Sequence, residues 1–206
     1  MVRDMSSKKR SREPSQKRGL SKAEKIAIPI IIIIAVWVVY SLTQPSPSST
    51  TLPVTYSSLS QSGVAPDFTL PVVSSSGLTG QTLTLSSFRG KVVLLEFMEP
   101  WCPHCQHMAP VLDGLYAQYG AGNVVFISVE GNWEGATAND GANFIRTYGT
   151  NWTYVYDSSG SVMSEYGVSA TPTFFIIGKD GAISSSVSGE QTSDALAGAI
   201  SAAVNS

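Results

Sequence analysis

The sequence predicts an α/β domain preceded by a single membrane-spanning helix. Residues 26–42 form an apolar run without a charge. From Ala65 onward, strand-like and helix-like runs follow one another in the order β-α-β-α-β-α, and a hairpin and a helix end the chain. Both cysteines and both histidines of the 206 residues fall within EFMEPWCPHCQHMAP, residues 96–110. The reactive side chains of the predicted domain are therefore concentrated in one short segment.

Charge separates residues 1–25 from the rest of the chain. This tail holds nine of the 13 Lys and Arg residues and three of the 15 Asp and Glu residues, without apolar periodicity. It is predicted to be a disordered basic tail. The remaining 181 residues are acidic on balance and rich in Ser and Thr, which argues against nucleic acid as a partner.

The segment 26–42 is predicted to be a transmembrane signal anchor. As a helix it would be about 26 Å long, near the lower limit for crossing the hydrocarbon core. Trp37 and Tyr40 suit an interfacial aromatic belt. The basic tail before it predicts a cytoplasmic N-terminus and a single-pass protein of the cell membrane, whose remaining chain is extracytoplasmic. The alternatives are a signal peptide cleaved near Ser41–Thr43 and a buried core helix, although the run has no polar face.

Residues 43–63 are rich in Ser, Thr and Pro and predict an extended linker to a domain at 64–206. Strands are expected within 66–73 and 81–88, joined through the Gly-rich run 74–81, and then at 91–97, 123–129, 173–178 and 182–188. A short extended piece is expected at 153–156, and helices at 102–119, 141–148, 162–166 and 194–204.

The C-x-x-C pair, Cys102 and Cys105, comes at the predicted start of a helix that follows a buried strand. Unpaired N–H groups and the helix dipole stabilise a thiolate there, so Cys102 is expected to be the more exposed nucleophile and Cys105 the resolving thiol. Pro103 and His104 between them are expected to tune the redox chemistry, and positive charge on His104 would make the disulfide more oxidising. No separate cofactor is expected beyond the redox-active disulfide Cys102–Cys105.

Two other uses of the segment remain open at this stage. A structural disulfide would close too short a loop to stabilise the fold by much. A copper or zinc carrier could use CPHCQHM, with Cys102, His104, Cys105 and His107 as ligands. On a helix, however, both imidazoles would point nearly opposite to Cys102, so no metal site is assigned.

The runs APDFTL, TLSSFRGKVVLLEFMEPWCPHCQHMAPVLDGL and YGVSATPTFFIIGKDG resemble the thioredoxin-like superfamily, specifically its membrane-tethered TlpA/ResA and redoxin group, over residues 64–206. The resemblance implies a central mixed sheet flanked by helices, with an N-terminal strand pair and a βα insertion after the second strand. The CPHC motif is similar to that of DsbA, the periplasmic oxidase, but the chain lacks room for DsbA's helical domain before Pro172. A peroxiredoxin is not indicated, because P-x-x-x-T-x-x-C is missing.

The same resemblance assigns further site residues. Pro172 matches the cis-proline that faces the C-x-x-C, and Thr171 would present its backbone to a substrate peptide; an ordinary trans proline is the alternative. Glu96 matches a buried acid that relays a proton to or from Cys105; the alternative is a glutamate that reaches solvent. Trp101 matches the tryptophan that shields the disulfide and contacts substrate. Whether Glu99, Glu130 and Trp133 border the site is not established by the sequence.

These observations predict an extracytoplasmic thiol-disulfide oxidoreductase that acts on protein thiols and disulfides and is recycled by a membrane redox partner. The direction stays open: CPHC slightly favours an oxidase, and the TlpA/ResA-like scaffold implies a reductase. The alternative functions are a copper or zinc metallochaperone and an inert anchored adhesion module.

Overall fold

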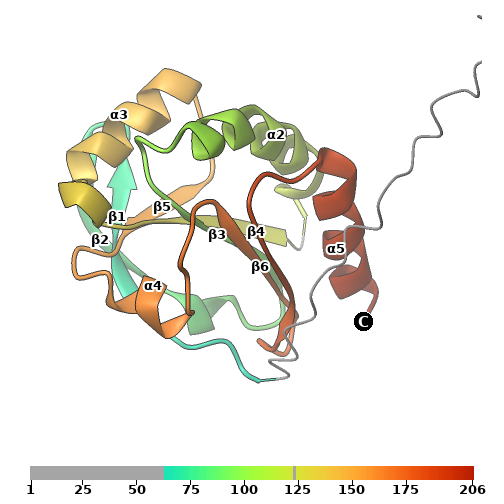
Figure 1. The fold of residues 1–206 in the computed structure, drawn as a ribbon. Helices are drawn as coiled ribbons and strands as arrows, with labels where there is room; N and C mark the ends of the chain where they lie inside the picture. Colours follow the sequence, from blue (N-terminus) through green and yellow to red (C-terminus); the bar gives the residue numbers. More distant parts are fainter. Residues whose placement is uncertain (1–62, 123) are drawn as a thin grey trace, which may run out of the picture. The chain divides into compact units, whose positions relative to one another are not determined.

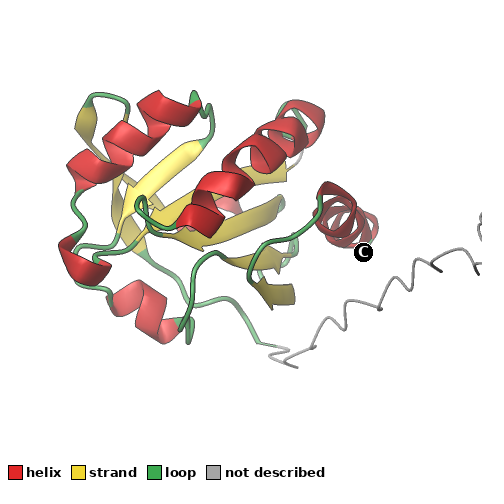
Figure 2. Ribbon diagram, turned by 45° about the horizontal axis from the view of Figure 1, so that its top comes forward, coloured by secondary structure: helices red, strands yellow, loops and turns green. Residues whose placement is uncertain are grey.

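The computed structural model describes residues 63–122 and 124–206, which form a seven-stranded mixed sheet with helices on both faces (Figures 1 and 2). The sheet order is β2-β1-β5-β4-β3-β6-β7. The strands are β1 (Thr69–Ser74), β2 (Gly77–Thr84), β3 (Val92–Met98), β4 (Val124–Glu130), β5 (Thr153–Tyr156), β6 (Thr173–Ile177) and β7 (Ile183–Ser188). The helices are α2 (Pro103–Tyr119), α3 (Ala138–Tyr148), α4 (Ser161–Glu165) and α5 (Ser193–Asn205), with 3-10 turns η1 (Leu85–Phe88) and η2 (Trp133–Gly135).

The predicted tail (1–25), transmembrane helix (26–42) and all but the last residue of the linker (43–63) lie outside the described residues. Within 63–122 and 124–206, none of the helices has the length and apolar character needed to cross a membrane.

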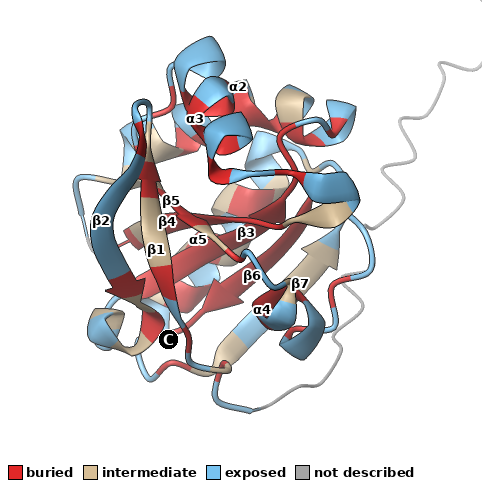
Figure 3. Ribbon diagram, turned by 90° about the vertical axis from the view of Figure 1, so that its left-hand side faces the viewer, coloured by how far each residue is buried: buried red, intermediate tan, exposed pale blue. Residues whose placement is uncertain are grey.

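β3 occupies the centre of the sheet, and all seven of its residues are buried (Figure 3). It runs parallel to β4, with Met98 opposite Glu130, and antiparallel to β6, with Glu96 opposite Phe174. Val and Leu on both faces of a strand suit burial between two helical layers. The strand therefore holds its last residues, and the loop to α2, in a fixed position.

Two apolar cores lie on opposite faces of the sheet. One contains Met98, Cys105 and Leu112 together with side chains of α3 and α5. The other contains Phe97 and Leu95 with residues of η1 and α4. Successive residues of a strand point to opposite faces, which is why Phe97 and Met98 belong to different cores.

The structure confirms a thioredoxin-like fold class and the predicted order of elements. The N-terminal pair β1 and β2 is antiparallel, and the insertion consists of α3 and β5, where β5 lies between β1 and β4. One detail differs: most of the Gly-rich run 74–81 belongs to β2 and not to the connection. The turn of the hairpin takes up only the two residues before Gly77. Gly77 has a φ of 105°, which residues other than glycine rarely adopt, and beyond it Leu78 pairs with Val73.

Candidate active site

The CPHC motif lies where β3 passes into α2. Cys102 is the N-cap of α2, with φ −71° and ψ 118°, and Pro103 is the first helical residue. Proline is favoured there because its fixed φ suits the first turn and its missing N–H would have no helical partner. The Cys102 N–H donates to the Glu99 carbonyl at 3.1 Å. The start of the helix predicted at Cys102 is confirmed.

Cys102 is held against the loop that carries Pro172. Its Sγ donates a hydrogen bond to the Thr171 carbonyl oxygen at 3.4 Å. Burial by itself raises the pKa of this thiol, but hydrogen bonds with Thr171, with the backbone and side chain of Cys105 and with the backbone of His104 outweigh it, and the pKa falls below 9.0. Backbone donors at a helix start act in this way because they favour the thiolate.

Cys105 lies deeper, in the apolar core beneath the first turn of α2. Its exposed fraction is 1%, against 5% for Cys102. Burial raises its pKa strongly, and the negative charge of Glu96 raises it further. Cys102 is thus the more exposed thiol, as predicted, although both side chains are largely buried.

Glu96 is buried in β3 and does not reach solvent, with 2% exposed. The Ser128 hydroxyl donates to its Oε2 at 2.5 Å, and the Trp152 indole N–H donates to Ser128 Oγ at 2.8 Å. Burial raises the pKa of Glu96 to about 7, against the opposing effect of the Ser128 hydrogen bond. A carboxyl group with this pKa can gain or lose a proton near neutral pH.

The peptide bond between Thr171 and Pro172 is cis, which fits the resemblance and not the trans alternative. Thr171 and Pro172 come directly before β6, the strand next to β3. The structure therefore brings Thr171 and Pro172 to the Cys102 side of the site.

Trp101 is 45% exposed beside Cys102, and its indole N–H donates to the Trp133 carbonyl at 3.3 Å. Side chains from the segment before α2, from α2 and from α3 line a surface groove next to it. They are Pro100, Trp101, Gln106, Asp140, Asn143, Phe144, Thr147 and Tyr148. The indole is therefore partly exposed beside the groove, and its contact with a substrate stays a prediction.

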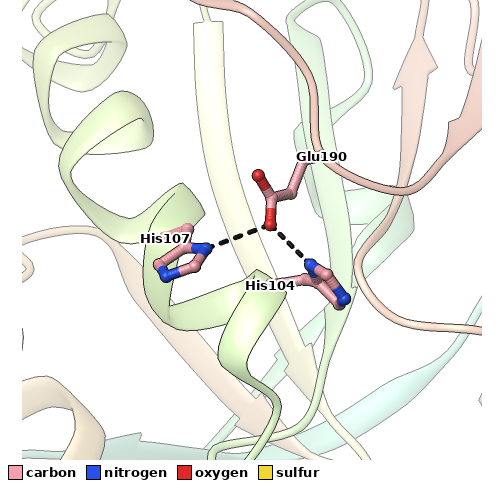
Figure 4. A group of neighbouring side chains, drawn as sticks. All are labelled: His104, His107 and Glu190. Carbon is pink, nitrogen blue, oxygen red and sulfur yellow. Dashed lines mark hydrogen bonds and ion pairs between the residues drawn. The ribbon is translucent and has the colours of Figure 1, made fainter.

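His104 and His107 both point toward Glu190, in the loop between β7 and α5 (Figure 4). The cysteines are buried and the imidazoles are exposed, so CPHCQHM does not converge on one four-ligand site. Nothing in the sequence singles out Glu190, because 86 positions separate it from His104.

Two more buried acids lie at the ends of β3 and β4. Glu99 Oε1 accepts the Trp133 N–H at 3.1 Å, and Glu130 Oε1 accepts the Gly141 N–H at 3.0 Å. The Oε2 atom of each has no hydrogen-bond partner among the described residues. Burial raises the pKa of Glu99 to about 7 and that of Glu130 to about 8. A Cβ at Gly131 would collide with Glu99 Oε1 and one at Gly141 would collide with Glu130 Oε2, so each carboxyl group occupies space that a glycine leaves open.

Comparison with known proteins agrees with this geometry. The model of the AhpC/TSA family matches residues 62–186. The thiol-disulfide oxidoreductase ResA of Bacillus thuringiensis subsp. konkukian is 32% identical over 119 residues, which cover 58% of this chain and 67% of that protein. ResA of Bacillus subtilis is 30% identical over 135 residues, 66% of this chain and 71% of that protein.

A solved structure of a secreted Mycobacterium tuberculosis disulfide oxidoreductase, homologous to E. coli DsbE, has a TM-score of 0.56 and 28% identity, and covers 66% of this chain and 95% of that one. The chain therefore belongs to the AhpC/TSA family, as a thioredoxin-like thiol-disulfide oxidoreductase of the TlpA/ResA type.

Proposed function

We propose that this oxidoreductase exchanges disulfides with protein substrates through Cys102 and Cys105 of the CPHC motif. One observation carries the proposal: Cys102, a thiol with lowered pKa at a helix start, lies 3.4 Å from the backbone carbonyl of Thr171. An extended substrate segment paired with the Thr171 backbone would place its sulfur next to Cys102.

In the reducing direction, the Cys102 thiolate attacks a substrate disulfide, forms a mixed disulfide and releases one substrate thiolate. Cys105 then passes its proton to the Glu96 carboxylate and attacks Cys102 Sγ, which releases the second substrate sulfur as a thiolate. The enzyme ends as the Cys102–Cys105 disulfide and the substrate gains two electrons. Oxidation of a substrate dithiol follows the same steps in reverse.

The oxidising direction is the one we propose. Lowering the pKa of Cys102 stabilises the reduced enzyme, and a stabilised reduced form makes the disulfide the stronger oxidant. The test is the reduction potential of the full chain, measured by thiol trapping in glutathione buffers. A value near about −120 mV supports an oxidase, and a value near or below about −270 mV assigns a reductase.

We further propose that residues 26–42 anchor the enzyme in the cell membrane with the catalytic domain outside the cytoplasm. Support comes from the charge of residues 1–25 and the apolar run that follows. A membrane redox partner would then recycle the site. Protease added to intact cells should remove the catalytic domain, and protection from the protease would overturn the proposed orientation.

A further inference from the structure

His104, His107 and Glu190 form a cluster on the surface of the domain (Figure 4). Glu190 Oε1 lies 2.5 Å from His104 Nδ1 and 3.1 Å from His107 Nδ1. Within the part of the chain that the structure describes, it is the one group of three metal-ligating side chains whose ligand atoms lie within 4.8 Å of one another.

The backbone holds the three side chains in this arrangement. His104 and His107 are three residues apart in the first turns of α2, a spacing that places both on one face of a helix. The loop of Glu190 is fixed on both sides: the Gly189 N–H donates to the Pro172 carbonyl at 2.8 Å, and the Gln191 N–H donates to Met108 Sδ at 3.3 Å. The loop that carries Glu190 is therefore held beside the start of α2 by contacts other than those of the carboxylate.

The chemistry of the set selects a class of ion. Two imidazole nitrogens and one carboxylate oxygen are a ligand set that holds Zn²⁺ with an open fourth position. The set has no sulfur, which disfavours Cu(I) and favours a borderline divalent ion.

The dimensions also allow an ion to enter. Ligand atoms around tetrahedral zinc lie about 3.3 Å apart. The Glu190 oxygen therefore has to move away from His104 Nδ1 by about 1 Å, and the three ligand atoms, which lie within 4.8 Å of one another, have to close to that spacing. The side chains are free to move, because 66%, 69% and 43% of His104, His107 and Glu190 are exposed.

We propose that His104, His107 and Glu190 bind a divalent transition-metal ion of the Zn²⁺ type at the mouth of the active site, without the cysteines as ligands. Metal ions bind deprotonated ligands, so binding should weaken as pH falls. This site does not depend on the proposed exchange reaction.

The test is a calorimetric titration with ZnCl₂ of the full chain in detergent, carrying C102S and C105S and no polyhistidine tag. One equivalent of Zn²⁺ is expected to bind. Adding H104A, H107A or E190Q should each raise the Kd at least about tenfold. The matched control is E165Q, which removes an exposed glutamate on α4 and should leave the Kd unchanged.

Absence of saturable binding would overturn the proposal, as would a Kd that E190Q and both histidine variants leave unchanged. All three side chains are exposed, so the variants should fold, and circular dichroism checks this. Because the protein titrated has no cysteine, the result is independent of whether the proposed disulfide exchange is correct.

Discussion

Cys102 and Cys105 are three residues apart, yet their surroundings differ in almost every respect that controls a thiol. Cys102 is the N-cap of α2, and hydrogen bonds with Thr171 and with the backbone of Cys105 and His104 lower its pKa. Cys105 is one turn further into the core, where burial and the charge of Glu96 raise its pKa. The C-x-x-C spacing alone therefore does not make both thiols reactive; the helix start and the buried acid assign them opposite tasks.

The largest expected effect comes from replacing each cysteine in turn. C102S should lower the turnover of a disulfide substrate at least about a thousandfold, because the attacking sulfur is lost. C105S should also stop turnover but leave the attack intact, so a mixed disulfide with substrate accumulates. Non-reducing electrophoresis after mixing with substrate distinguishes the two. Accumulation of the adduct in C102S instead would reverse the assignment.

E96Q is expected to impair only the Cys105 half of the reaction. The pKa of Glu96 is about 7, so the fraction of carboxylate that can accept the Cys105 proton rises as pH passes through 7. Loss of this base should slow resolution of the mixed disulfide about 10- to 100-fold at pH 8 and remove the inflection near pH 7. Stopped-flow measurement of substrate release checks this; an unchanged inflection would exclude Glu96 as the base.

E130Q is the matched control, because Glu130 is an equally buried acid at the end of the neighbouring strand. Burial raises its pKa from 4.5 to about 8, so the folded protein keeps a proton that the unfolded chain loses. The free energy of unfolding should therefore fall as pH rises from about 4.5 to 8. E130Q should be more stable than the wild type at pH 9 in urea denaturation, with an unchanged pH profile of exchange. A profile like that of E96Q would show that any buried acid produces the effect.

W101A should weaken the binding of a protein substrate on the Cys102 side of the site, and its effect on exchange should be smaller than that of the cysteine variants and E96Q. The exposed indole offers apolar contact to a protein substrate, and its removal should raise KM several-fold with little change in kcat. Exchange with a small disulfide such as oxidised glutathione serves as the control, since it lacks a surface to contact Trp101. An equal loss with both substrates would mean that Trp101 acts on the thiol itself.

Much of this site could be predicted from the sequence, because its central parts are local. The apolar run of β3, the Cys102–Cys105 spacing and the helix that follows lie within 28 consecutive residues, and strand and helix preferences act over such distances. The cis-proline loop is far from the two cysteines in sequence, and it was predicted only through the resemblance to a known family.

What could not be predicted depends on contacts between distant segments. Ser128 reaches Glu96 only once β3 and β4 pair, and Trp152 reaches Ser128 only once β5 pairs with β4. Glu190 meets His104 only after the last hairpin folds back. The carboxyl groups of Glu99 and Glu130 occupy space left open by Gly131 and Gly141, contacts that form only in the folded chain. The sequence alone does not show whether a glutamate at the end of a strand is buried or exposed.

The smallest effect expected is that of S128A, and it tests why Glu96 titrates where it does. The Ser128 hydrogen bond at 2.5 Å favours the carboxylate and opposes the effect of burial, so its loss should raise the pKa of Glu96 above about 7. The inflection in the resolving step should move up by about one pH unit.

S128A should therefore be slow at pH 7 and recover at pH 9, whereas E96Q stays slow at both. W152F keeps the Ser128 hydroxyl but removes the indole N–H that donates to it at 2.8 Å. W152F should therefore also raise the pKa of Glu96, but by less than S128A does. If neither variant moves the inflection, the pH dependence does not come from Glu96, and the contrast between the two thiols would rest on the helix start and on burial alone.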